Sequence, residues 1–164
     1  MLLRDPPEPP DPSTLEIENV LLASEGRDIP RPAVDFTAEI ARRSEASVHV
    51  FSIARVWGTG LGLPMPGLLP SKREWDDQHA VVERAVTALR KRGLQADGRV
   101  VGTRKGAKRI TREAERLGCD AIVMGADPRK PWLVGDFMWS QEPHRVRRRA
   151  RVPVYLIQPG PGAA

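Results

Sequence analysis

The stretch Asp120-Ala121-Ile122-Val123-Met124-Gly125 decides the fold of this chain of 164 residues. Its four central residues are all apolar, so they predict a short strand that is buried on both faces. Strands of this kind belong to parallel sheets with helices on both sides. Gly118, just before the strand, terminates a segment with apolar residues at helical spacing, namely Ala107, Ile110, Ala114 and Leu117. The stretch is therefore interpreted as the strand of an α/β unit.

The same alternation of helix and strand extends outward in both directions. Short apolar or β-branched runs predict strands at residues 17–23, 47–53, 96–101, 121–124 and 152–157. Helical periodicity predicts helices at residues 31–43, through the apolar stripe of residues 81–89, through residues 107–117, and at residues 143–150. Strands that are joined through helices run parallel, with right-handed crossovers. The pattern predicts a doubly wound α/β domain with a five-stranded parallel sheet.

Proline marks the two ends of the chain. The segment 1–16 contains the run Pro-Pro-Glu-Pro-Pro-Asp-Pro, and proline lacks the N–H that a helix or an interior strand needs. We therefore expect a disordered or extended proline-rich tail at residues 1–16. A single domain is expected at residues 17–158, because the length fits one domain. Residues 159–164, rich in proline and glycine, are expected to form a flexible tail.

Composition narrows the class of protein. Cys119 is the only cysteine, so it cannot form an intramolecular disulfide, and nothing indicates an oxidising compartment. No run of about 18 apolar residues occurs, which argues against a membrane span, and the N-terminal residues lack the apolar core of a signal peptide. A cytoplasmic protein is expected. The net charge of +5 is compatible with a phosphate-bearing partner but does not require one.

Several segments, in order, resemble the universal stress proteins. The run Val20-Leu21-Leu22-Ala23-Ser24-Glu25-Gly26-Arg27 is similar to their first strand and turn. Asp120 to Gly125 is similar to their fourth strand, and Arg151-Val152-Pro153-Val154 to the approach to their last strand. The resemblance covers roughly residues 17–158. It implies the strand order 3-2-1-4-5 of the adenine nucleotide alpha hydrolase-like folds, with a ligand crevice where the first and fourth strands lie side by side.

The resemblance also implies a site for an adenine nucleotide, whose phosphate half is altered here. Relatives that bind ATP share a loop of the pattern Gly, two residues, Gly, nine residues, Gly, then Ser or Thr. This chain keeps the first glycine, Gly125, but has Pro128 at the second. The third position falls on Met138-Trp139, or on Ser140-Gln141 if about two residues are inserted. Asp127 would add negative charge near the phosphates, which is unfavourable unless Arg129 or Lys130 offsets it.

The adenosine half of that site is better preserved. Glu25 stands where relatives usually have an aspartate, so the carboxylate is kept on a longer side chain. Apolar walls are expected from Ile53, Met124 and Gly125. The candidate ligand is ATP or another adenine nucleotide, although no cofactor is required by the sequence. The candidate binding residues are Ala23, Ser24, Glu25, Ile53, Met124, Gly125, Asp127, Arg129, Ser140 and Gln141.

No catalytic or metal-binding set is evident. The three histidines are far apart in sequence and lack ligand spacing, and no nucleophile, base and orienting carboxylate can be named together. We therefore expect that the protein is not an enzyme, although slow ATP hydrolysis stays open, and that it binds no metal ion. The loop from Trp132 to Trp139 is too apolar to remain in water. It is interpreted as a lid over the crevice or as part of a subunit interface.

The function that follows is a regulatory stress-response module that acts through protein contacts. The apolar edge strand near Val154–Ile157 is expected to pair with a second copy, giving a homodimer. A first alternative is an ATP-binding stress sensor with slow or no hydrolysis. A second alternative is a basic protein that associates with nucleic acid through its arginine-rich segment. We disfavour nucleic acid because the arginines are expected to surround their helix and no aromatic residues lie between them.

Overall fold

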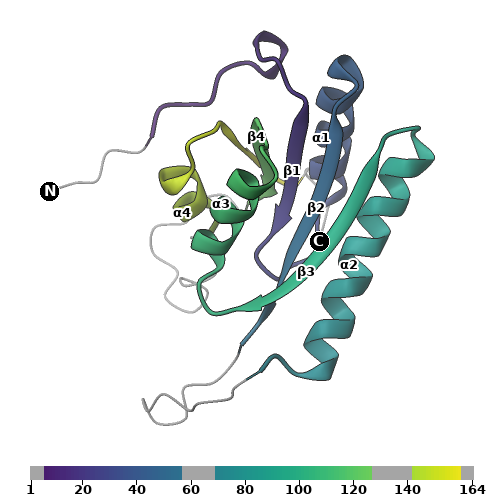
Figure 1. Cartoon of the computed structure of the whole chain (residues 1–164), viewed down its shortest axis with the longest axis vertical. Helices are drawn as coiled ribbons and strands as arrows, with labels where there is room; N and C mark the ends of the chain where they lie inside the picture. Colours follow the sequence, from purple (N-terminus) through teal and green to yellow (C-terminus); the bar gives the residue numbers. More distant parts are fainter. Residues whose placement is uncertain (1–5, 57–68, 127–141, 160–164) are drawn as a thin grey trace, which may run out of the picture.

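The computed structural model describes residues 6–56, 69–126 and 142–159. Strands and helices alternate through these residues, as the apolar periodicity predicts (Figure 1). After a short 3-10 turn, η1 (Pro12–Thr14), the elements are β1 (Asn19–Ser24), α1 (Arg31–Ser44), β2 (Ser47–Arg55), α2 (Lys72–Lys91), β3 (Ala96–Thr103), α3 (Gly106–Arg116), β4 (Ala121–Gly125), α4 (Glu142–Arg149) and β5 (Val154–Ile157).

The five strands form one parallel sheet in the order β3-β2-β1-β4-β5. This is the order that the family resemblance implies, and it confirms the predicted fold class. The register places Leu21 of β1 beside Ile122 of β4. Because β2 and β4 flank β1 on opposite sides, the chain reverses its direction of winding at β1, and a crevice opens there at the carboxyl ends of the strands.

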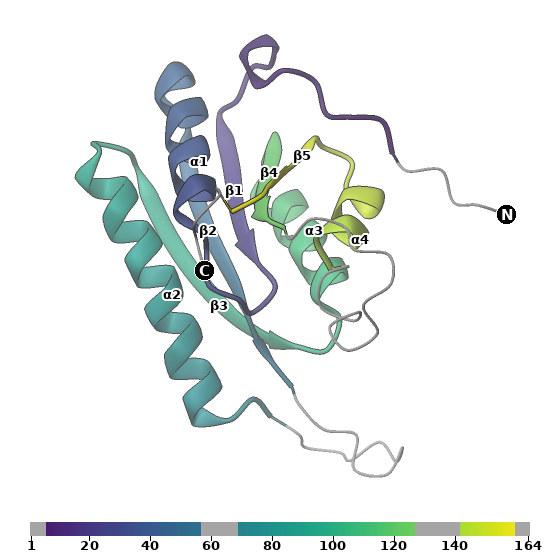
Figure 2. The same ribbon diagram turned by 180° about the vertical axis from the view of Figure 1, so that it is seen from behind.

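Helices cover both faces of the sheet. In Figure 1, α1 and α2 lie on one side of the strands and α3 and α4 on the other, and Figure 2 shows the same two layers from behind. Successive side chains of β1 alternate between these layers. Val20 and Leu22 pack in the cluster under α1 and α2, whereas Leu21 and Ala23 pack in the cluster under α3 and α4. Burial on both faces is what the apolar runs predict.

Strands β2 and β3 extend further than predicted. β2 continues two residues past Ile53, to Arg55, and β3 continues to Thr103. The side chain of Arg55 was expected in a loop but is only 8% exposed. A charged residue that follows an apolar run usually indicates the start of a loop. Arg55 remains in the strand because of its tertiary contacts.

The N-terminal segment is extended up to η1, as its prolines require. Asp11 precedes η1, and its side chain accepts a hydrogen bond from the Ser13 N–H at 2.8 Å. Residues 6–12 contact the rest of the domain through hydrogen bonds from Arg147 and Tyr155. This part of the expected tail is therefore held against the domain rather than detached from it. Residues 1–5 and 160–164 lie outside the described residues.

Candidate functional site

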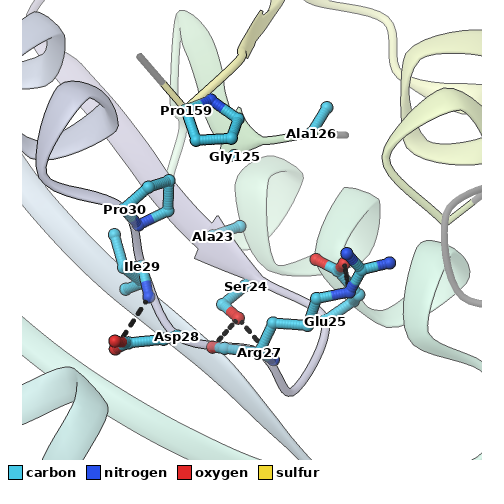
Figure 3. Close-up of a pocket in the computed structure, with 10 residues that line it drawn as sticks. All are labelled: Ala23, Ser24, Glu25, Arg27, Asp28, Ile29, Pro30, Gly125, Ala126 and Pro159. Carbon is cyan, nitrogen blue, oxygen red and sulfur yellow. Dashed lines mark hydrogen bonds and ion pairs between the residues drawn. The ribbon is translucent and has the colours of Figure 1, made fainter. Parts of the chain in front are cut away.

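A small cavity marks the crevice at the carboxyl ends of β1 and β4. Its volume is about 130 Å³, and Figure 3 shows the residues around it. Four of the predicted binding residues meet there, three of them at the end of β1 or directly after it and one at the end of β4. The cavity is lined by Ala23, Ser24, Glu25, Arg27, Asp28, Ile29, Pro30, Gly125, Ala126 and Pro159. The first and fourth strands therefore end at one cavity, which four of the residues selected from the sequence line.

Ser24 organises the turn that follows β1. Its Oγ accepts hydrogen bonds from the N–H groups of Gly26 (3.3 Å) and Arg27 (3.0 Å) and donates one to the carbonyl of Arg27 (2.6 Å). A hydroxyl has one donor and two acceptor positions, so the turn uses all of them. Gly26 adopts a φ of +99°, which favours glycine. Ser24 shapes the crevice but keeps no hydrogen-bonding capacity for a ligand.

Glu25 is buried and already paired. Its side chain is 4% exposed, and its Oε1 lies 3.1 Å from Nε of Arg27 (Figure 3). Burial raises the pKa of the Glu25 carboxyl, while a hydrogen bond at its own backbone and the charges of Arg27 and Arg55 act in the opposite direction. The carboxylate that the resemblance assigns to a ligand is therefore directed at this protein's own arginine.

Arg55, the last residue of β2, packs against the turn after β1. Its Nε donates a hydrogen bond of 2.6 Å to the carbonyl of Glu25. Burial lowers the pKa of Arg55 to about 10, and the charge of Glu25 opposes that shift, so the guanidinium stays charged at neutral pH. A Cβ on Gly26 would lie 2.6 Å from Arg55 Nε. The turn after β1 is thus fitted closely around this arginine, which the sequence analysis did not select.

A second polar contact ties the turn to α2. The Nε2 of Gln78 donates to the carbonyl of Gly26 at 3.0 Å, and its Oε1 accepts a hydrogen bond of 2.6 Å from Ser52 Oγ. Gln78 is 4% exposed and Ser52 is fully buried. Gln78 lies one helical turn before the apolar pair Val81 and Val82, so it belongs to the buried face of the helix. A polar residue on a buried face needs a hydrogen-bond partner, and the sequence could have identified Gln78 on that ground. The network joins the turn after β1 to β2 and to α2.

Pro30 occupies the opposite side of the crevice. It precedes α1, and its carbonyl accepts hydrogen bonds from the N–H groups of Ala33 (2.9 Å) and Val34 (3.3 Å). Its ring also lies against Gly125, where an added Cβ would be 2.6 Å from both Cγ and Cδ of the proline. Gly125 is therefore explained by packing alone, whether or not a phosphate approaches it.

The remaining predicted binding residues do not line this cavity. Ile53 and Met124 are 1% and 0% exposed and pack in the core cluster under α3 and α4. Their side chains are directed into that core rather than at the cavity. Asp127, Arg129, Ser140 and Gln141, together with the loop from Trp132 to Trp139, lie outside the described residues.

Basic side chains gather around a separate cavity of about 490 Å³ between the start of α3 and α4. Glu142 is the one acidic side chain that lines it in the described part of the chain. Its Oε2 accepts a hydrogen bond of 3.0 Å from the Ala107 N–H, and its Oε1 accepts one of 2.7 Å from Arg145. The basic residues are Arg104, Lys105, Lys108, Arg145, Arg148 and Arg149. Three of the α4 arginines thus share one side, rather than surrounding the helix as expected.

No group of three potential metal ligands occurs among the residues that the structure describes. His49 is held by its neighbours, with Nδ1 at 2.9 Å from an Asp97 oxygen and Nε2 at 3.2 Å from Asn19 Oδ1. The described helices also include none that is long and apolar enough to cross a bilayer.

A parallel sheet that changes its winding direction above a crevice defines a Rossmann-like α/β domain. Within that class, the model of the universal stress protein family matches residues 16–158, so the chain belongs to this family. None of the curated proteins matches the chain.

Solved structures share the fold at low sequence identity. A universal stress protein from Burkholderia pseudomallei is 24% identical, with a TM-score of 0.64 over 85% of this chain and 95% of that one. One from Archaeoglobus fulgidus, in complex with dAMP, is 20% identical, with a TM-score of 0.63 over 87% and 99%. A universal stress protein in complex with cAMP is 17% identical, with a TM-score of 0.63 over 89% and 100%.

Proposed function

We propose that this protein is a regulatory module of the stress response that acts through protein contacts and binds adenine nucleotide only weakly. The family supports the general role. The weak binding of nucleotide is supported by the contacts that the crevice residues already make with one another. Arg27 and Arg55 hold Glu25, and Pro30 packs on Gly125. We expect no catalytic activity beyond slow ATP hydrolysis at most.

The size of the crevice supports weak binding. Small-molecule sites usually enclose about 300–1,000 Å³, whereas the cavity here measures about 130 Å³. A nucleotide would have to displace the Arg27 side chain from Glu25 or move Pro30. Breaking a buried contact between a carboxylate and an arginine is costly, because each charge loses its partner in a poorly solvated place.

The chemistry of the following loop supports the same conclusion. Pro128 stands at the second glycine position of the family pattern, and proline has no N–H to donate to a phosphate. The loss of one charge-assisted hydrogen bond costs about 1.5–3 kcal/mol. This corresponds to an affinity about 10- to 100-fold weaker than that of a relative with glycine at this position.

A nucleotide sensor is the second candidate, because solved relatives were crystallised with dAMP, with cAMP and, in an Arabidopsis thaliana protein, with AMP. Those ligands show what the related proteins bind. For this chain, the sensor requires that a nucleotide displaces Arg27 from Glu25 or moves Pro30.

The proposal includes a homodimer through β5. This strand lies at the edge of the sheet, and its four residues, Val154–Ile157, carry no charge. An uncharged edge strand is prone to pair with another strand. A twofold axis would place two such edges antiparallel.

The nucleotide content of the purified protein tests the proposal. We expect a denatured extract to contain no stoichiometric adenine nucleotide, and calorimetry with ATP, AMP or cAMP and Mg²⁺ to give a Kd above about 10 µM. The Arg27→Met variant frees Glu25 within the crevice and should change any weak binding. Arg31→Met removes an arginine that is 87% exposed and should not. Retained nucleotide, or a Kd below about 10 µM, would favour the sensor instead.

A further inference from the structure

Residues 6–12 cross the free edge of β5. At one end, the Tyr155 hydroxyl donates a hydrogen bond of 2.6 Å to the Pro10 carbonyl. The Tyr155 ring belongs to the core layer under α1, where it lies 5.3 Å from the Phe36 ring. At the other end, Arg147 Nη2 donates to the carbonyls of Pro6 and Pro7, at 3.2 and 2.8 Å. Arg147 belongs to α4, on the opposite face of the sheet, so the segment passes from one layer to the other around the edge.

The segment lies over the whole edge strand. A groove of about 360 Å³ separates them, and all four residues of β5 line it. Glu8 to Pro12 form the other wall, together with Phe36 and Arg147. Figure 2 shows the segment leaving η1 toward the side of the domain where β5 and α4 lie.

The backbone of β5 nevertheless remains available for pairing. The carbonyls of Pro153 and Ile157 accept hydrogen bonds from the N–H groups of Ile122 in β4 and of Ala126 directly after it. Because bonding direction alternates along a strand, Val154 and Leu156 direct their N–H and C=O groups to the free edge. No backbone hydrogen bond joins residues 6–12 to β5 in the described part of the chain. Five of these seven residues are proline, so the segment lacks the donors that an added strand needs.

From this arrangement we propose that residues 6–12 are a releasable cover of the β5 edge, and that their release permits self-association through that edge. The inference rests on the proposed homodimer and adds its regulation. The segment is attached by side-chain hydrogen bonds to three of its carbonyls, and it covers a strand that it cannot pair with. A second copy of this chain provides the N–H and C=O groups that the segment lacks.

The expected effect is amplified because both copies must release their covers. When only a fraction of the molecules is competent, the apparent dissociation constant rises in inverse proportion to that fraction. A dimer needs two uncovered molecules, so its apparent dissociation constant varies with the inverse square of the uncovered fraction. If removal of the hydrogen bonds lowers the ratio of covered to uncovered molecules by about tenfold, the dimer becomes about 100-fold tighter.

The test uses the full chain with the double substitution Arg147→Ala and Tyr155→Phe. Phenylalanine keeps the packing on Phe36 and removes only the hydroxyl. A deletion of residues 1–10 removes the cover but keeps Asp11, which caps η1. Arg148→Ala is the matched control, because it removes one arginine of α4 that makes no hydrogen bond to the segment. Sedimentation velocity over a concentration series gives the dimer constant of each protein.

We expect the double variant to dimerise about 100-fold more tightly than the wild type and the Arg148→Ala control, and the deletion to dimerise at least as tightly as the double variant. Leu156→Pro removes an outward N–H and spares the bonds to β4, so it should abolish this gain. If the wild type, the double variant, the deletion and the Arg148→Ala control have equal dimer constants, the proposed cover is wrong, but the proposed β5 dimer is not contradicted. A deletion variant that stays monomeric at high micromolar concentration, or a dimer that survives Leu156→Pro, would overturn both the cover and the β5 dimer.

Discussion

The contact between Gly125 and Pro30 gives a direct test of why a glycine ends β4. The resemblance assigns this glycine to a phosphate loop, whereas the structure gives it a packing role. In the Gly125→Ala variant, the new methyl group would lie 2.6 Å from Cγ and Cδ of Pro30. Ordinary contacts between carbon atoms are about 3.5–4.0 Å, so the methyl group is about 1 Å too close.

The short distance between the new methyl group and the Pro30 ring determines how much stability the variant loses. Overpacking of this kind costs about 1–3 kcal/mol, and for a domain of this length each kcal/mol lowers Tm by about 2–4 °C. We therefore expect Gly125→Ala to lower Tm by about 2–12 °C. Pro30→Ala removes the ring but keeps the carbonyl that begins α1. It should cost about 0.4–1 kcal/mol through the greater freedom of the unfolded chain.

Urea denaturation of the wild type, both single variants and the double variant measures the interaction between the two sites. If the proline ring excludes the methyl group, the double variant should be about as stable as Pro30→Ala alone. Gly106→Ala is the control, because its Cβ would meet other atoms only at 3.4 Å. Two effects that add to within about 0.5 kcal/mol would refute the packing explanation of Gly125.

Two further predictions concern buried groups. Burial tends to raise the pKa of the Glu113 carboxyl, but the hydrogen bond and charge of Arg116 and the charge of Arg99 outweigh it and hold that pKa below its usual value. The Glu113→Gln variant should therefore be less stable than the wild type at pH 7. The urea midpoints of the two proteins should converge as the pH falls below 4.5, because the carboxyl of the wild type then becomes protonated. A difference between the two midpoints that stays constant with pH would contradict this prediction. Burial raises the pKa of the Cys119 thiol to about 12, so iodoacetamide should modify it only in urea, and rapid labelling of the native protein would show that the thiol is accessible.

Much of the fold could be predicted because it depends on local patterns. Ala121 to Met124 are apolar on both faces, and that alone indicates a central parallel strand. The position of β1 beside β4 came from the family resemblance, since strand order depends on which elements pack together and not on periodicity. The ends of β2 and β3 were predicted too early, because Arg55 and Thr103 are polar residues whose partners are distant in sequence.

The candidate site was predicted in part. Ala23, Ser24, Glu25 and Gly125 were selected because each ends a strand or follows one, and the family resemblance places those two strands side by side. The pattern did not show which layer a neighbouring side chain enters, so Ile53 and Met124 were selected although they face the core.

The sequence by itself determined the α/β class, the approximate positions of the strands, and the extended path of a proline-rich segment, because each follows from short-range periodicity or from the chemistry of single residues. Tertiary structure alone decided that Arg27 and Arg55 hold Glu25, that Pro30 meets Gly125, and that residues 6–12 cross β5. These contacts join segments that are far apart in the chain or separated by a turn. Their formation depends on how helices and loops are placed around the sheet, which local propensity does not specify.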